Sequence, residues 1–399
     1  MKVSDFDFDL PDELIAQEPP PLRGDSRLLV LHRDSGQVEH SSFSRIAEYL
    51  RRSDLLVLNN TKVFPARLLG HRLPGGGVVQ CLLLRQLPTP NAQSPTPNAQ
   101  RPPPQLPTPQ LPTPQLPTPN ANGGLGVGGL GVGKLGVGSW AYWEALMHPG
   151  QKLKPGARVV FEGSGVRLHG EVTAQHFHGR RTIRLWVEQD IDVAGAIDRI
   201  GHVPLPPYIK REDRPSDRDR YQTVYARERG SIAAPTAGLH FTDAVLDALA
   251  SRGVERTELT LHVGYGTFKP IRSDQVEDHV VDPEACVVPA DAVAALTRAR
   301  SEGRRIIAVG TTTVRALESL SVSAGGTIDG CPDEAGVFIR PGHEFRLVDG
   351  LITNLHLPRS SLLVLVAAFA GRARILDTYR EAVARGYRFY SYGDAMVIV

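Results

Sequence analysis

The chain has 399 residues, of which 41% are hydrophobic and 22% charged, a composition typical of a globular protein with two or three domains. Its formal net charge of +2 excludes the global basic field of a general nucleic-acid binder, so RNA binding would have to come from local patches. The three cysteines, Cys81, Cys286 and Cys331, form no CxxC pair and indicate reduced thiols.

Neither a signal peptide nor a membrane span is predicted. The N-terminus "MKVSDFDFDLP" is acidic and has no apolar core. The longest apolar run, residues 362–370, is too short to cross a bilayer. We therefore expect a cytoplasmic monomer that makes no contact with membranes.

Short alternating runs make up much of the first half of the chain. "FPARLLGHR" and "VVQCLLLR" come first, and "SWAYWEALMH", "ARVVFEG", "VRLHGEVTAQ" and "RRTIRLWVEQ" follow later. Glycine-rich turns separate them, a pattern that favours an antiparallel β-barrel or a small sheet.

A segment of biased composition separates the first two of these runs from the last four. From about residue 86 to 139 the sequence repeats "LPTPQ" and then "GGLGVG". Such a segment cannot bury enough apolar surface to offset its ordering entropy, so we predict a disordered insertion in a strand-to-strand loop, with no catalytic role. Docking to proline-recognising domains is the alternative interpretation.

From about residue 222 strands alternate with helices. "TELTLHVG" (257–264) alternates apolar and polar residues, whereas "RRIIAVG" (304–310) and "DGLITNLHLP" (349–358) are predicted buried strands. Helices are expected from Thr242 to about Arg252, from Thr311 to about Leu320, and from Ser360 onward. This order predicts an α/β domain with a mostly parallel sheet.

Three junctions between these elements are rich in small, hydroxyl and imidazole side chains. They are "PTAGLHFT" (235–242), "VGTTTVRALES" (309–319) and "TNLHLPRSS" (353–361). Because ligands of open α/β sheets bind at the carboxyl ends of the strands, these junctions are predicted walls of one pocket. "LHVGYGTF" (261–268) adds two glycines that let backbone approach a ligand.

Each of these features also has a structural interpretation. A histidine in a loop commonly caps or packs, and Arg315 and Glu318, three residues apart on one helix, could pair with each other. The histidines could instead be zinc ligands, although no HxH, HExxH or CxxC spacing supports a metal site.

The segment "PLPPYIKREDRPSDRDRYQTVYARERG" (204–230) carries seven positive and five negative side chains together with three tyrosines. It is either a solvated loop or a surface that grips phosphates and stacks on unpaired bases. Under the second interpretation the tRNA-binding residues are Tyr208, Lys210, Arg211 and Tyr221.

Many of these strings, in this order, resemble the S-adenosylmethionine:tRNA ribosyltransferase-isomerase family of bacterial queuosine synthesis. They include "LLVLNNTKVFPARL", "GHVPLPPYIKR", "AAPTAGLHFT", "TLHVGYGTFKP", "VGTTTVRALES", "TNLHLPRSSLL" and "YRFYSYGDAM". The resemblance runs from about residue 3 to the C-terminus, apart from the insertion at about 86–139.

The resemblance implies an α/β domain formed by residues 1–61 and 209–399, with a smaller antiparallel β-barrel domain at 62–208 inserted in it. It implies that S-adenosylmethionine is a co-substrate, that no metal is needed, and that tRNA is the partner. The ribosyl portion would be transferred and isomerised onto 7-aminomethyl-7-deazaguanine at the anticodon wobble position, giving epoxyqueuosine in tRNA and releasing adenine and methionine.

That chemistry needs a positioned base, a donor for the leaving purine and anchors for a carboxylate. The candidate catalytic residues are His240, His262, Arg315 and Glu318, with His240 or His262 as base or acid. Thr311–Thr313, or Arg359 and Ser360, would hold the carboxylate, and Gly264 and Gly266 would admit the adenosyl group. The full set of candidate S-adenosylmethionine ligands is Thr236, Gly238, Gly264, Gly266, Thr267, Thr311, Thr312, Thr313, Asn354, His356, Arg359 and Ser360.

The sequence departs from the family pattern at one motif. Where the family reads H-x-M-H-x-E, this chain has "HVVDPE" (279–284), with Asp282 in the second histidine position. A milder change is "NNTKV" (59–63), where the family tends to have Asp and Arg. Asp282 leaves a non-catalytic tRNA-binding paralogue as one alternative. A histidine-dependent metal hydrolase is a second, separate alternative.

Overall fold

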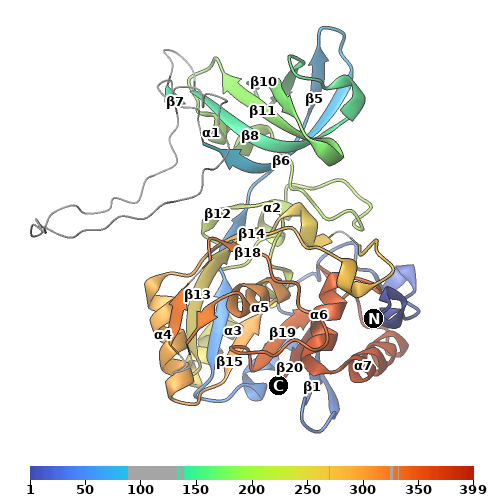
Figure 1. The fold of residues 1–399 in the computed structure, drawn as a ribbon, viewed down its shortest axis with the longest axis vertical. Helices are drawn as coiled ribbons and strands as arrows, with labels where there is room; N and C mark the ends of the chain where they lie inside the picture. Colours follow the sequence, from blue (N-terminus) through green and yellow to red (C-terminus); the bar gives the residue numbers. More distant parts are fainter. Residues whose placement is uncertain (89–132, 135–138, 269, 324–326, 331) are drawn as a thin grey trace, which may run out of the picture.

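Four parallel strands form the centre of a nine-stranded sheet in the larger of two lobes (Figure 1). The computed structural model describes residues 1–88, 133–134, 139–268, 270–323, 327–330 and 332–399. Most of the predicted insertion at about 86–139 therefore lies outside the described residues. Both termini lie in the larger lobe (Figure 1).

The strands of the large sheet follow one another in the order β18 (Glu334–Ala335), β14 (Glu284–Val287), β13 (Glu255–Leu261), β3 (Leu55–Asn59), β15 (Ile306–Val309), β19 (Gly350–Asn354), β20 (Ala395–Ile398), β1 (Arg27–Leu31) and β2 (Val38–Ser42). Strands β13, β3, β15 and β19 are mutually parallel. β20 runs antiparallel to β19, and β1 runs parallel to β20. The predicted, mostly parallel α/β sheet is confirmed.

Two hydrophobic cores cover the two faces of this sheet. In β15, Ile306 and Ala308 belong to one core and Ile307 and Val309 to the other, so all four residues are buried. Such strands read as continuous apolar runs, because neither face meets water.

Helices complete both cores. Helices α4 (Ala290–Ser301), α5 (Thr311–Glu318), α6 (Ser361–Ala370) and α7 (Arg372–Ala384) contribute to the first core, while α3 (Asp243–Ser251) and the 3-10 helix η3 (Phe43–Tyr49) contribute to the second. Thr242 and Ser360 cap α3 and α6 by accepting bonds from Val245 N and Leu363 N. Both helices begin where the sequence predicted.

The smaller lobe is a closed antiparallel barrel (Figure 1). Its strands are β5 (Arg67–Leu73), β6 (Val78–Leu87), β7 (Gly133–Lys134), β8 (Ser139–His148), β9 (Arg158–Gly163), β10 (Val166–Gln175) and β11 (Arg180–Val187). Pairing of β11 with β8 closes it, and α1 (Val193–Ile200) packs Val193 and Ile197 into its interior. The predicted barrel is confirmed.

Short elements connect the lobes and finish the chain. Strand β4 (Thr61–Val63) leads from β3 toward the barrel and pairs in parallel with β12 (Glu228–Ser231), beyond α2 (Asp217–Arg220). The remaining strands, β16 (Ser321–Val322) and β17 (Ile328–Gly330), pair with each other. The domain limits at residues 61–62 and 208–209 stay a prediction.

Candidate active site

The carboxyl ends of three of the four parallel strands, β13, β15 and β19, border a cavity with about 350 Å³ of empty space. The strands are followed by Val263, Gly310 and His356, which all line it. Its wall consists of Ala234, Pro235, Thr236, Ala237, Val263, Thr267, Gly310, Thr311, Thr312, Thr353, Asn354, His356 and Leu362. The structure thus brings the three junctions together, with six of the predicted ligand-binding residues in one wall: Thr236, Thr267, Thr311, Thr312, Asn354 and His356.

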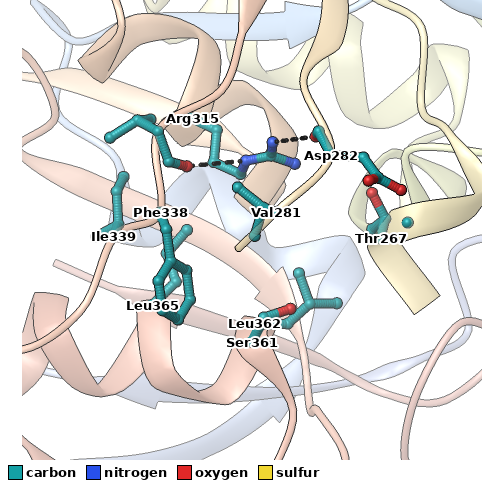
Figure 2. A pocket seen from close by; sticks show the side chains of 11 residues that line it. Thr267, Val281, Asp282, Arg315, Phe338, Ile339, Ser361, Leu362 and Leu365 are labelled. Atoms are coloured by element: carbon teal, nitrogen blue, oxygen red, sulfur yellow. Dashed lines mark hydrogen bonds between the residues drawn. The ribbon is translucent and has the colours of Figure 1, made fainter. Parts of the chain in front are cut away.

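A second cavity, with about 370 Å³ of empty space that includes its opening to solvent, adjoins the first, and the two share Thr267 and Leu362. Figure 2 shows its apolar side, where Phe338, Leu365 and Ile339 gather beneath Arg315. Gly266, Asp282 and Val281 also line it. Of the two cavities, this one offers the more apolar surface for a ring system.

Helix α5 presents its first turn to the first cavity. Gly310, directly before it, has φ +91°, a left-handed conformation that glycine adopts without strain. The first turn of a helix leaves backbone N–H groups without intrahelical partners. Thr311 and Thr312 line the cavity, whereas the Thr313 hydroxyl donates back to Val309 O at 2.6 Å.

Two buried polar atoms in this wall have no hydrogen-bond partner within the described part of the chain. They are Thr312 Oγ1 and Asn354 Oδ1. A buried polar group without a partner costs about 1–3 kcal/mol and calls for an explanation. A bound ligand that forms hydrogen bonds with both atoms would explain why they have no partner within the protein.

His240 lies behind Asn354 and outside both cavity walls. Its Nδ1 is 2.7 Å from Ser26 Oγ, and its Nε2 is 3.0 Å from Asn354 Nδ2. Phe43 packs on the ring at a centroid distance of 5.2 Å. Burial lowers the pKa of His240 to about 4, so its imidazole is neutral at physiological pH.

The other two histidines occupy different positions. His356 lines the first cavity, with Nε2 2.8 Å from Thr353 Oγ1, and burial lowers its pKa to about 3. His262 lines neither cavity, and its Nδ1 is 2.7 Å from Thr61 Oγ1. Burial also lowers the pKa of His262.

Arg315 and Glu318 bind different partners and not each other. Arg315 Nη1 donates to Glu284 at 2.6 Å, and its other nitrogens reach the backbone carbonyls of Asp282, Ala335 and Val337. Figure 2 shows the bond to Asp282. Glu318, at the far end of α5, accepts the backbone N–H groups of Arg346, Leu347 and Val348. Glu318 thus anchors a loop and lines neither cavity.

Glu284 also belongs to this region, although it is not among the catalytic or ligand-binding residues predicted from the sequence. Its Oε1 accepts Gly264 N at 2.8 Å and the Thr267 hydroxyl at 2.6 Å, while Oε2 pairs with Arg315. One carboxylate therefore ties the loop after β13 to helix α5. The signal in the sequence was its match to the last position of the family's H-x-M-H-x-E motif.

Three more candidates have structural roles outside the two cavities. Arg359 pairs with Asp7, and the Ser360 hydroxyl caps α6, so neither side chain faces the cavities. A Cβ at Gly238 would lie 2.2 Å from the Tyr225 hydroxyl, so this glycine is required for packing.

The predicted tRNA-binding residues divide by exposure. Lys210 is exposed, and Arg211 forms two hydrogen bonds with Asp217, at 2.7 and 2.9 Å. Tyr208 packs edge-on against Tyr390 at a centroid distance of 4.0 Å. Tyr221 is fully buried, so its ring is not accessible for stacking on a base in this conformation.

An open cleft of about 1,210 Å³ lies between the two lobes. Barrel residues such as Gln80 and His148 line one side, and Gly264 and Tyr265 line the other. Tyr265 is 42% exposed. Since Val263 and Thr267 line the first cavity, the loop of residues 263–267 borders both the cleft and the cavity.

The described residues show neither a metal-binding cluster nor a membrane-spanning helix. They contain no group of three His, Cys, Asp or Glu side chains placed to hold a metal ion. No helix among them has the length and apolar character needed to span a bilayer.

Comparisons with known proteins return one family. The family described as "Queuosine biosynthesis protein" matches residues 3–398. The S-adenosylmethionine:tRNA ribosyltransferase-isomerase of Halothermothrix orenii is 42% identical over 401 residues, covering 100% of both chains. The protein of the same name from Nitratidesulfovibrio vulgaris strain DP4 is 45% identical, covering 99% of this chain and 97% of its own. The crystal structure of S-adenosylmethionine tRNA ribosyltransferase from Thermotoga maritima is 34% identical, with a TM-score of 0.48, covering 99% of this chain and 100% of that one.

Proposed function

The chain belongs to the queuosine biosynthesis protein family, and on that premise we propose that it is an S-adenosylmethionine:tRNA ribosyltransferase-isomerase. It transfers and isomerises the ribosyl portion of S-adenosylmethionine onto 7-aminomethyl-7-deazaguanine at the wobble position of a tRNA anticodon. The product is epoxyqueuosine in tRNA, and adenine and methionine leave.

The observation that carries this proposal is the first cavity, whose wall holds two buried, unpartnered polar atoms, Thr312 Oγ1 and Asn354 Oδ1. Thr311, Thr312 and the first turn of α5 suit the carboxylate of S-adenosylmethionine, because free N–H groups and the helix dipole favour an anion there. The adjoining apolar cavity, with Phe338 and Gly266 in its wall, suits the adenosyl group.

The reaction requires removal of a proton from the carbon next to the sulfonium and departure of adenine. His356 is the imidazole in the cavity wall, and burial keeps it neutral. We assign it hydrogen bonding to the substrate and not proton removal, because a pKa of about 3 is too low for a general base at neutral pH. The Glu284 carboxylate fixes the loop of Gly264 and Thr267, so this wall is held in place before the substrate arrives.

The tRNA reaches the site through the cleft between the lobes. A base flipped from the anticodon loop would pass Tyr265, whose exposed ring offers a stacking surface, and meet the ribosyl carbon beyond Thr267. Lys210, exposed on the connecting segment, can contact a phosphate.

The test is a reaction with purified protein, S-adenosylmethionine and tRNA that carries 7-aminomethyl-7-deazaguanine. Digestion of the tRNA to nucleosides and mass spectrometry should show epoxyqueuosine, with adenine released in equal amount. The same tRNA with guanine at the wobble position is the matched control and should remain unmodified. Binding of precursor tRNA without adenine release would identify a non-catalytic paralogue.

A further inference from the structure

The wall of the first cavity carries no acidic, Lys or Arg side chain among the described residues, and its one imidazole is neutral. A lone charge in such a place would have no counter-charge, whereas a group with one positive and one negative end is neutral as a whole. The two unpartnered atoms are of complementary kinds. The Thr312 hydroxyl can donate, and Asn354 Oδ1 can only accept.

The orientation of the Asn354 amide follows from its surroundings. One of its terminal atoms lies 3.0 Å from the backbone carbonyl of Tyr390, which only accepts hydrogen bonds. That atom must therefore be the nitrogen, since a flipped amide would put two acceptors together. The oxygen is then the branch without a partner, in a residue that lines the cavity.

The same reasoning fixes the role of His240. Asn354 Nδ2 donates to His240 Nε2, so this ring nitrogen carries no proton, and Nδ1–H donates to Ser26 Oγ at 2.7 Å. Both ring nitrogens are occupied within the protein. His240 therefore holds the Asn354 amide and has no ring nitrogen left for a substrate.

We propose that this cavity recognises an amino-acid zwitterion: the first turn of α5 and the Thr312 hydroxyl take the carboxylate, and Asn354 Oδ1 accepts from the α-ammonium. His240 is a positioning residue that acts through Asn354. The inference rests on the proposed function for the identity of the ligand, since methionine is the zwitterionic end of S-adenosylmethionine. Beyond the proposed function, the inference assigns Asn354 as the residue that selects for the α-amino group of the substrate.

The test compares S-adenosylmethionine with its deamino analogue, in which hydrogen replaces the α-ammonium. With saturating precursor tRNA, we expect kcat/KM of the unaltered chain to favour S-adenosylmethionine on the order of 10- to 100-fold, the range for one hydrogen bond to a charged group. Asn354→Ala should reduce that preference to about threefold or less, because the acceptor is gone. An unaltered chain that uses both compounds equally, or an Asn354→Ala variant that keeps the full preference, would overturn the inference.

Equilibrium binding separates this inference from the proposed function. Calorimetric titration of the unaltered chain with each compound should give the same preference without any turnover. Absence of epoxyqueuosine together with preferential binding of the amino compound would refute the proposed function alone. Normal tRNA modification without any preference would refute the zwitterion site alone.

Two variants test the positioning role of His240. His240→Gln keeps an acceptor for Asn354 Nδ2 and should retain most of the preference, whereas His240→Leu should lose it while the protein stays folded. The matched control is His40→Leu, because His40 bonds to Tyr387 and Glu381 outside the site. A His240→Leu variant with the unaltered preference would contradict the positioning role, since a purely structural residue would change stability and leave this ratio intact.

Discussion

At the residue scale, the environment of each histidine determines what it can do. His240 and His356 are 4% exposed, and their partners are an amide, hydroxyls and aromatic rings without counter-charges. Desolvation therefore dominates, and it lowers the pKa of both imidazoles. Neutral imidazoles are hydrogen-bonding parts of this site, and their protonation would oppose the native state.

A pH dependence of stability follows from this burial. The pKa values of His240 and His356 fall from 6.5 to about 4 and about 3 on folding, so the unfolded chain binds more protons in that interval. The stabilisation is fully present above pH 6.5 and is lost as the pH falls toward 4, by about 1.4 kcal/mol per pH unit for each histidine. Urea unfolding at a series of pH values should show His356→Gln with a shallower decline than the unaltered chain.

The matched control for this pH series is His176→Gln, at an exposed turn of the barrel. It should reproduce the decline of the unaltered chain. A His356→Gln variant with that same decline would contradict the assignment of acid sensitivity to buried imidazoles.

At the element scale, the strands and helices next to the site could be predicted because their signals are local. Strand β15 reads as an apolar run that ends in glycine, and α3 begins at a threonine cap. Helix α5 ends at Glu318, within two residues of the predicted end at about Leu320. The contact made by that last residue could not be predicted: the Glu318 carboxylate accepts backbone N–H groups from the loop of residues 346–348. These hydrogen bonds join residues that lie 28–30 positions apart in the sequence, so no local sequence pattern predicts them.

The first turn of α5 supports a prediction about substrate binding. Thr312→Val keeps the shape of the side chain but removes the unpartnered hydroxyl. We expect an unchanged or raised Tm, because an unpaired buried polar atom is lost, and a KM for S-adenosylmethionine raised about tenfold. Thr313→Val, one residue on, breaks the bond to Val309 O and should instead lower stability by about 1 kcal/mol. Steady-state kinetics and thermal unfolding measure both, and an unchanged KM for Thr312→Val would rule out its hydroxyl as a ligand.

At the scale of the whole molecule, the site depends on contacts between distant parts of the chain. Ser26 and His240 are 214 residues apart, Thr61 and His262 are 201 apart, and Asn354 and His240 are 114 apart. Sequence reasoning could collect the strand ends at one edge of the sheet, because parallel topology brings them there. It could not orient the side chains, so His240 and His356, alike in the sequence, lie on opposite sides of the cavity wall.

The barrel gives the last prediction, which concerns residues 89–132. Strands β6 and β8 pair directly over a long stretch, from Gln80 with His148 to Leu87 with Tyr142. A short Gly-Ser linker can therefore join Pro88 to β7 in place of residues 89–132, and loop length changes closure entropy only slowly. We expect the shortened protein to keep its Tm and to release adenine within about twofold of the full-length rate, because the strand pairing and both cavities stay intact. A Gly-Ser segment of the original length is the control: if both replacements lose activity while folded, the native segment takes part in catalysis, and if only the short one does, its length is needed.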